Sequence, residues 1–231
     1  MHVPDGFIDA PGSIAAGVVA VAGVGVALRG ARHELDDRIA PLAGLTAAFV
    51  FAAQMLNFPV AAGTSGHLLG GALAAILVGP YAGVLAVSVV LLLQALLFAD
   101  GGLTAIGVNI ILMALVPVIV GYLLFRLLLR VLPKSRASVS GAAFAAAFVS
   151  VPASALAFTL VYAADGTADV SIGKVAAAML GVHVLIGIGE ALITAVTVSS
   201  VLAVRPDLVY GARDRLRPVE LRVTRPSASK A

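Results

Sequence analysis

Residues 81–98 read YAGVLAVSVVLLLQALLF, a run of eighteen residues without a formal charge. About 20 apolar residues are enough for a helix to cross the hydrocarbon core of a bilayer. Similar runs lie on both sides, and we predict helices over residues 12–29, 40–56, 66–79, 81–98, 104–129, 138–163 and 173–203. The pattern predicts an all-α membrane protein, a bundle of seven transmembrane helices within residues 1–204. The third segment is short, breaks at Gly79-Pro80, and is expected to be tilted or partly covered by its neighbours.

The composition supports this class. The chain has 231 residues, of which 61% are hydrophobic and 12% charged, with a mean hydropathy of +1.08. A soluble domain usually has about 25% charged residues. The absence of cysteine excludes disulfides and thiolate metal sites. The pI near 9.6 is explained by loop orientation, so we expect membrane lipid and no nucleic acid among the partners.

The basic residues predict the orientation in the membrane. If the N-terminus lies outside, 14 of the 15 Lys and Arg residues fall on the inner side, and only Lys174 falls outside. Cytoplasmic loops carry an excess of Lys and Arg, so we predict an outer N-terminus and a cytoplasmic C-terminus in a prokaryotic cell membrane. Residues 205–231 are predicted to form a basic, disordered cytoplasmic tail.

The first apolar segment could also be read as a signal peptide. A signal peptide has a basic n-region before its apolar part. Residues 1–11 contain Asp5 and Asp9 but no Lys or Arg. We therefore predict an uncleaved anchor with Met1 retained, because initiator methionine is normally trimmed only before small residues and His2 is large.

The first two residues, Met1-His2, contain the donors of a planar metal chelate. The terminal amine, the amide nitrogen of His2 and its Nδ1 can close two fused rings on one ion, provided that the metal displaces the amide proton. His67, in a charge-free loop on the same side, could fill the remaining in-plane position. Four nitrogens in a plane favour Ni²⁺ or Cu²⁺ and can force Co²⁺ low-spin, whereas Zn²⁺ prefers a tetrahedron. From the residues alone, an ordinary N-terminus without a metal remains the alternative.

Other polar residues lie at or just inside the outer helix ends. They could cap helices and form turns, or they could orient the imidazoles and hold the N-terminal tail. This group comprises Asn57, Thr64, Ser65, Gln94, Asp100 and Asn109.

His183 and Glu190 lie seven residues apart and share a helix face. Glu190 is the only acidic residue deep in a predicted span, and an intramembrane carboxylate is costly and therefore a functional candidate. The alternative is a polar pair that fixes the bundle. Glu190 lies two turns inward of His183, so we do not expect it to contact the metal, and we expect Glu190→Gln to leave metal binding largely intact.

Four blocks of the sequence resemble the CbiM/NikM family, the substrate-binding membrane components of energy-coupling-factor (ECF) transporters for cobalt and nickel. The blocks are 1–8 (MHVPDGFI), 57–70 (NFPVAAGTSGHLLG), 94–109 (QALLFADGGLTAIGVN) and 181–194 (GVHVLIGIGEALIT). The resemblance covers residues 1–204 and implies seven helices, with the metal bound by Met1, His2 and His67. It also implies a transmembrane coupling protein (T component), two cytoplasmic ATPases and a small accessory membrane subunit as partners, and a link to cobalamin biosynthesis.

Two other functional classes fit the sequence less well. A stand-alone divalent-cation secondary transporter or channel would need several ionisable residues along its path, and this chain has essentially one. An intramembrane metalloenzyme would need an open coordination position and a general base. The chain has no G-x-x-x-x-G-K-[ST] motif for ATP. We therefore predict a non-enzymatic subunit that captures Co²⁺ or Ni²⁺ as its transported substrate.

Overall fold

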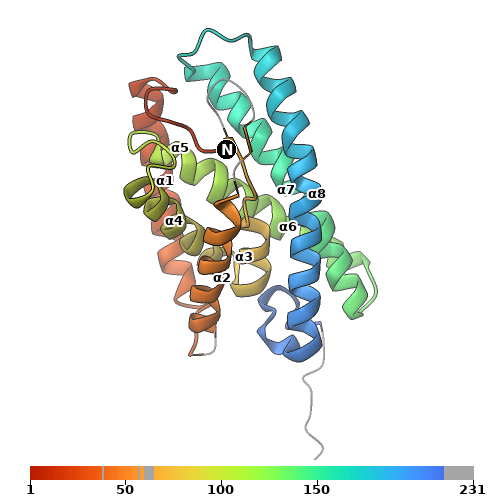
Figure 1. The fold of residues 1–231 in the computed structure, drawn as a ribbon. Coiled ribbons are helices and arrows are strands. Elements are labelled where there is room, and N and C mark those ends of the chain that lie inside the picture. Colours follow the sequence, from red (N-terminus) through yellow and green to blue (C-terminus); the bar gives the residue numbers. More distant parts are fainter. Residues whose placement is uncertain (38, 57, 60–64, 216–231) are drawn as a thin grey trace, which may run out of the picture.

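The computed structural model describes residues 1–37, 39–56, 58–59 and 65–215. This part of the chain is helical apart from one antiparallel pair, β1 (Phe58–Pro59) with β2 (Ser65–Gly66). The helices are α1 (Ala10–Ala31), α2 (Ile39–Gln54), α3 (Gly71–Val78), α4 (Pro80–Leu97), α5 (Ile106–Ile110), α6 (Val116–Val131), α7 (Arg136–Asp165) and α8 (Ile172–Val204). A π-helical turn, Ile111–Leu115, joins α5 to α6. Figure 1 shows these helices as one bundle, with α3 in its middle.

The predicted helical segments all appear, and the all-α prediction is confirmed. The stretch from Ile106 to Val131 runs as one helix through α5, the π turn and α6. Five helices are long and apolar enough to cross a membrane: α1, α4, the 106–131 helix, α7 and α8. α2 is apolar but has only 16 residues. The described residues therefore form a multi-pass membrane protein.

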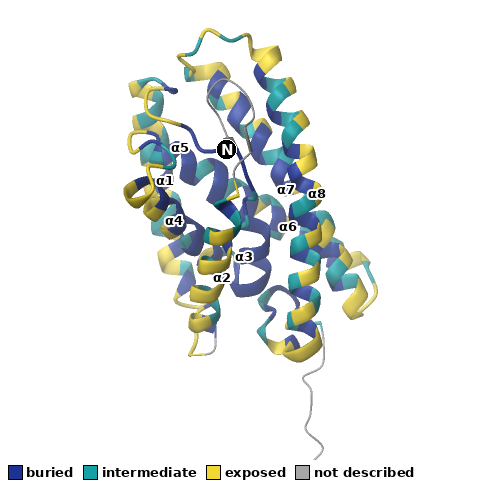
Figure 2. Cartoon of the chain, in the orientation of Figure 1, coloured by how far each residue is buried: buried dark blue, intermediate teal, exposed yellow. Residues whose placement is uncertain are grey.

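The third predicted segment differs most from expectation. We predicted a helix over 66–79, but α3 has eight residues, about 12 Å at the rise of an α-helix. It is therefore too short to cross a hydrocarbon core of about 30 Å. All eight residues are buried, as Figure 2 shows by their dark blue colour. The predicted break is present: Gly79 adopts φ +101°, and Pro80 begins α4, where its missing N–H costs nothing.

The π turn has a local cause in the sequence. Pro117 has no N–H group, so the carbonyl of Met113 has no i+4 donor and regular α-helical bonding is interrupted there. The widened turn Ile111–Leu115 lies directly before this position. π turns recur near functional sites, and here Asn109, one turn earlier, points to the N-terminal tail.

The segment after α8 packs against the bundle. It forms two 3₁₀ turns, Pro206–Leu208 and Tyr210–Ala212, and Val209 is fully buried. A Cβ at Gly211 would lie 2.7 Å from Cε1 of Phe125. The tail predicted to be disordered from residue 205 therefore begins with a docked segment, because Val209 and Ala212 have apolar surface to bury. Its remainder, 216–231, lies outside the described residues.

Candidate metal-binding site

The N-terminal tail runs from the start of α1 back into the bundle, where the N label lies in Figure 1. Met1 and Val3 have no exposed surface, and His2 is 5% exposed. Asn109 binds both backbone groups of Val3: its Oδ1 accepts from Val3 N–H at 2.7 Å, and its Nδ2 donates to Val3 O at 3.2 Å. The N–H of Gly102 also donates to Val3 O, at 2.8 Å. Both backbone groups of Val3 are therefore hydrogen-bonded to the bundle, by the Asn109 side chain and by the backbone of Gly102.

Two loops hold the next residues of the tail. Before α5, Thr104 donates to Asp5 Oδ1 from its backbone N–H at 2.7 Å and from its hydroxyl at 2.6 Å. After α7, the Thr167 hydroxyl donates to Gly6 O at 2.7 Å, and its N–H donates to Phe7 O at 3.1 Å. Thr104 and Thr167 were not predicted as site residues, because their role is to hold the tail and not to bind an ion.

The two ring nitrogens of His2 face different side-chain oxygens. Its Nε2 lies 3.1 Å from Gln94 Oε1, which can accept a hydrogen bond from an Nε2–H group. Its Nδ1 is buried without a hydrogen-bond partner among the described residues, although Asp100 Oδ1 lies 3.0 Å away. Nδ1 is the atom that the predicted chelate requires.

In His67, Nδ1 is the hydrogen-bonded ring nitrogen and Nε2 is the nitrogen without a partner among the described residues. Its Nδ1 lies 2.7 Å from the carbonyl oxygen of Leu68, so Nδ1 carries the proton. Its Nε2 is fully buried and has no hydrogen-bond partner in the described part of the chain. The His2 and His67 rings stack with centroids 4.5 Å apart and planes 30° apart. Burial lowers the pKa of His67 well below its ordinary 6.5, so the ring is neutral at neutral pH.

The terminal amine of Met1 is fully enclosed. Burial lowers the pKa of this amine from its ordinary 8.0 to about 4, while the charge of Asp100 acts in the opposite direction. The amine is therefore neutral near pH 7, with its lone pair available. Its charge, when present, would act on both His67 and His183, which places these three groups in one neighbourhood.

The structure brings together three of the six polar residues named from the sequence. Gln94 and Asp100 flank the His2 ring, and Asn109 holds Val3. Asn57 and Thr64 lie outside the described residues. Ser65 contributes its backbone to β2, and its side chain is not among those described.

His183 and Glu190 make separate contacts rather than a pair with each other. His183 Nδ1 donates to Met179 O at 2.7 Å, and its buried Nε2 has no partner within the described residues. Glu190 accepts from the N–H groups of Leu69 and Gly70. Sequence reasoning identified both residues but could not find their partners.

Comparisons with known proteins agree on one family. Residues 2–208 match the CbiM family model, described as a cobalt uptake substrate-specific transmembrane region. The chain is 44% identical to a putative metal transport protein of Haloquadratum walsbyi, over 91% of this chain and 94% of that protein. It is 34% identical to the cobalt transport protein CbiM of Sorangium cellulosum, over 96% of this chain and 98% of that protein.

Further similarities extend to nickel proteins and to a solved structure. The chain is 41% identical to a putative fused nickel transport protein NikMN of Archaeoglobus fulgidus, over 90% of this chain and 68% of that protein. A crystal structure of a truncated transition metal transporter superposes with a TM-score of 0.71 at 31% identity. That match covers 88% of this chain and 99% of the other.

Proposed function

Because the chain belongs to the CbiM family of cobalt and nickel transport membrane proteins, we propose that it is the metal-capturing subunit of an ATP-driven ECF importer. The observation that carries the proposal is the enclosure of three nitrogen lone pairs at the end of the tail. They belong to the Met1 amine, to His2 Nδ1 and to His67 Nε2. A fold that only needed to bury its N-terminus would gain nothing by leaving His67 Nε2 without a partner in the described part of the chain, because such an atom costs about 1–3 kcal/mol.

The proposed substrate is Co²⁺ or Ni²⁺. The amide nitrogen of His2 lies between the amine and the imidazole and would complete a set of four nitrogens. Neutral imidazole and amine donors suit late transition metals. Since the amine is already neutral near pH 7, only the amide must lose a proton to the entering ion.

The direction and energy of transport complete the proposal. The excess of Lys and Arg on one side favours an outer N-terminus, so the ion would enter from outside and travel towards the cytoplasm. The chain has no phosphate-binding loop, so ATP hydrolysis would come from two cytoplasmic partner ATPases. A transmembrane coupling protein would connect them to this subunit in a prokaryotic cell membrane, and a small accessory membrane subunit would complete the complex.

The test is a titration of the purified protein with Ni²⁺ and with Co²⁺, beside a version with one glycine added before Met1. We expect stoichiometric binding and a planar Ni²⁺ absorption spectrum from the native protein only. His67→Ala should abolish tight binding. His33→Ala, which removes an exposed imidazole in the α1–α2 loop, should not. Equal binding by the native and extended proteins would rule out the amine chelate.

A further inference from the structure

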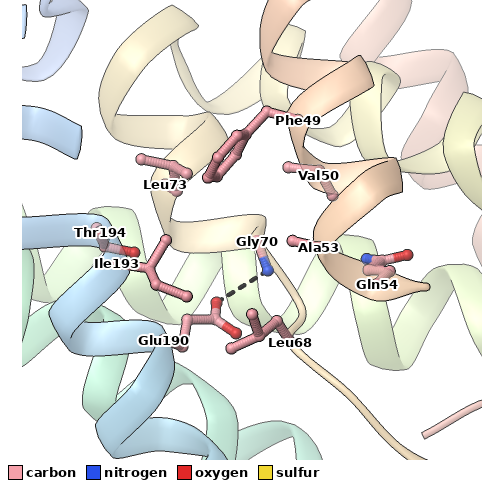
Figure 3. A pocket seen from close by; sticks show the side chains of 10 residues that line it. All are labelled: Phe49, Val50, Ala53, Gln54, Leu68, Gly70, Leu73, Glu190, Ile193 and Thr194. Atoms are coloured by element: carbon pink, nitrogen blue, oxygen red, sulfur yellow. Dashed lines mark hydrogen bonds between the residues drawn. The ribbon is translucent and has the colours of Figure 1, made fainter. Parts of the chain in front are cut away.

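The segment that carries His67 is held from two sides by buried polar side chains. From α8, Glu190 Oε2 accepts from Leu69 N–H at 2.6 Å, and Glu190 Oε1 accepts from Gly70 N–H at 2.9 Å. From α2, Gln54 Nε2 donates to Leu69 O at 2.7 Å. Figure 3 shows Glu190 and Gln54 on opposite sides of this segment, with the bond to Gly70 dashed.

The carboxylate of Glu190 is used only for backbone donors in the described structure. Glu190 is 2% exposed, and none of the ion pairs formed by the described residues includes it. A buried carboxylate is costly unless strong hydrogen bonds compensate it. Here the compensation comes from two N–H groups just before α3, where the helix dipole also favours negative charge. Holding this segment is therefore the role that explains a carboxylate at this position.

One peptide unit connects Glu190 to the His67 ring. The N–H of Leu69 and the C=O of Leu68 belong to the same planar peptide. Its N–H binds Glu190, and its C=O accepts the proton on His67 Nδ1 at 2.7 Å. The order is carboxylate, peptide, imidazole, with the unpartnered Nε2 at the far end. Hydrogen bonds in such a chain polarise one another, so the carboxylate both orients the ring and strengthens Nε2 as a donor to a metal.

We propose that Glu190 is a positioning residue for His67, acting through the Leu68–Leu69 peptide. The proposal rests on the proposed metal-binding function and adds a residue to it. In metal sites generally, a ligand histidine donates its other N–H to a carboxylate, carbonyl or water, and loss of that partner weakens binding about 10–100-fold. The expectation that Glu190→Gln leaves binding intact is therefore reversed. Glutamine offers one acceptor oxygen to two N–H groups, and its own NH₂ would face the second.

The experiment compares Ni²⁺ affinity and the Ni²⁺ absorption spectrum in the native protein, Glu190→Gln, Glu190→Asp and the control Thr194→Val. Thr194 is one turn away on the same helix, is buried, and lines the pocket of Figure 3 together with Glu190, but its hydroxyl has no hydrogen-bond partner within the described residues. We expect Glu190→Gln to weaken Ni²⁺ binding about 10–100-fold and to shift the absorption bands. Glu190→Asp, which keeps the charge but is one methylene shorter, should fall between. Thr194→Val should match the native protein.

Two further measurements separate the possible failures. In a His67→Ala background, Glu190→Gln should cause no additional loss of metal affinity, because the two changes act through the same ligand. If the native protein binds Ni²⁺ and folded Glu190→Gln binds it with native affinity and spectrum, the positioning role is refuted while the proposed function stands. If the native protein binds no metal, the proposed function itself fails. Should Glu190→Gln not fold, Glu190→Asp and Gln54→Leu, which loosen the same segment, decide the question by the same affinity measurement.

Discussion

Docking of the N-terminal tail should weaken steeply as the pH falls below 8. Burial lowers the pKa of the Met1 amine from 8.0 to about 4, so the docked tail favours the neutral amine and the undocked tail binds a proton. Above pH 8 the amine is neutral in both forms, so the docking constant does not depend on it. The docking constant falls as the pH is lowered from 8 to 4 and does not change further below pH 4. Each pH unit in that window changes the docking constant about tenfold. Between pH 8 and pH 6 the loss is about 2 kcal/mol, because half of the free amine is already protonated at pH 8.

The assay is amide hydrogen exchange on the metal-free protein. Two amides report docking directly: Val3 N–H, bound to Asn109, and Gly102 N–H, bound to Val3 O. Their protection factors, corrected for the intrinsic pH dependence of exchange, measure the opening of the tail. We expect both factors to fall about 50-fold from pH 8 to pH 6. Ser138 N–H, capped by the Ser135 hydroxyl at the start of α7, has no titrating partner and serves as the control.

Other titratable groups near the amine limit the pH range in which its effect on tail docking can be measured alone. His2, His67, His183 and Asp100 surround it. His67 has a lowered pKa, so its titration acts in the same direction but begins only near its ordinary value of 6.5. The change between pH 8 and pH 7 therefore isolates the amine. If the protection factor of Val3 N–H stays constant over that interval, or only follows that of Ser138 N–H, the conclusion that the docked tail buries a neutral amine is refuted.

Three substitutions test the packing around the tail and the C-terminal segment. Gly102→Ala places a Cβ about 2.7 Å from the backbone carbonyl carbon of Pro4, so it should displace the tail and weaken Ni²⁺ binding at least tenfold in a titration. Asn109→Ala removes both bonds to Val3 and should also weaken Ni²⁺ binding about 10–100-fold, with little change in the helical circular dichroism spectrum. Gly211→Ala crowds Phe125 and should lower the Tm by several degrees, at a cost of about 1–3 kcal/mol, with Ni²⁺ affinity unchanged.

Matched glycines provide the controls for these changes. A Cβ at Gly17 in α1 or at Gly141 in α7 meets no other atom within 4 Å. Alanine at either position should therefore leave Ni²⁺ affinity and Tm near the native values or slightly raised. If Gly17→Ala weakened Ni²⁺ binding as much as Gly102→Ala, the steric explanation would be wrong. If Gly211→Ala reduced Ni²⁺ affinity, the C-terminal segment would be connected to the site.

The sequence was sufficient to predict where the helices lie, but not how short and how completely buried α3 is. Apolar runs separated by charged or glycine-containing turns define the long helices, and Gly79-Pro80 defines the break before α4. Apart from His67, the residues from Gly66 to Val78 are small or apolar, so their composition does not show that the helix begins at Gly71. Directly before this start, Gly70 adopts φ +75°, and Glu190 binds the N–H groups of Leu69 and Gly70 from a position about 120 residues further along the chain.

The candidate metal-binding site, too, has features that the sequence predicts and features that only the fold determines. Met1 could be selected because it carries the terminal amine, and His2 and His67 because imidazole donors can be recognised from the sequence. The hydrogen bonds that orient the two imidazole rings could not be predicted from the sequence, because their acceptors are Gln94 Oε1 and the carbonyl of Leu68. A backbone carbonyl is present at every residue, so no pattern distinguishes the one that matters.

The anchors of the proposed ligands belong to different helices. His2 is oriented by Gln94 of α4, Val3 is held by Asn109 of α5, and the His67 segment is held by Glu190 of α8. A displacement of α8 relative to α4 that carried the His67 segment along would therefore change the separation of His2 and His67; it would keep these three anchors but break the bond from Gln54 of α2 to Leu69 O. Since a planar four-nitrogen site depends on His67 for its fourth position only, such a movement would convert a closed site into an open three-nitrogen one. The affinity of the proposed site is thus set by helix packing as well as by its donor atoms.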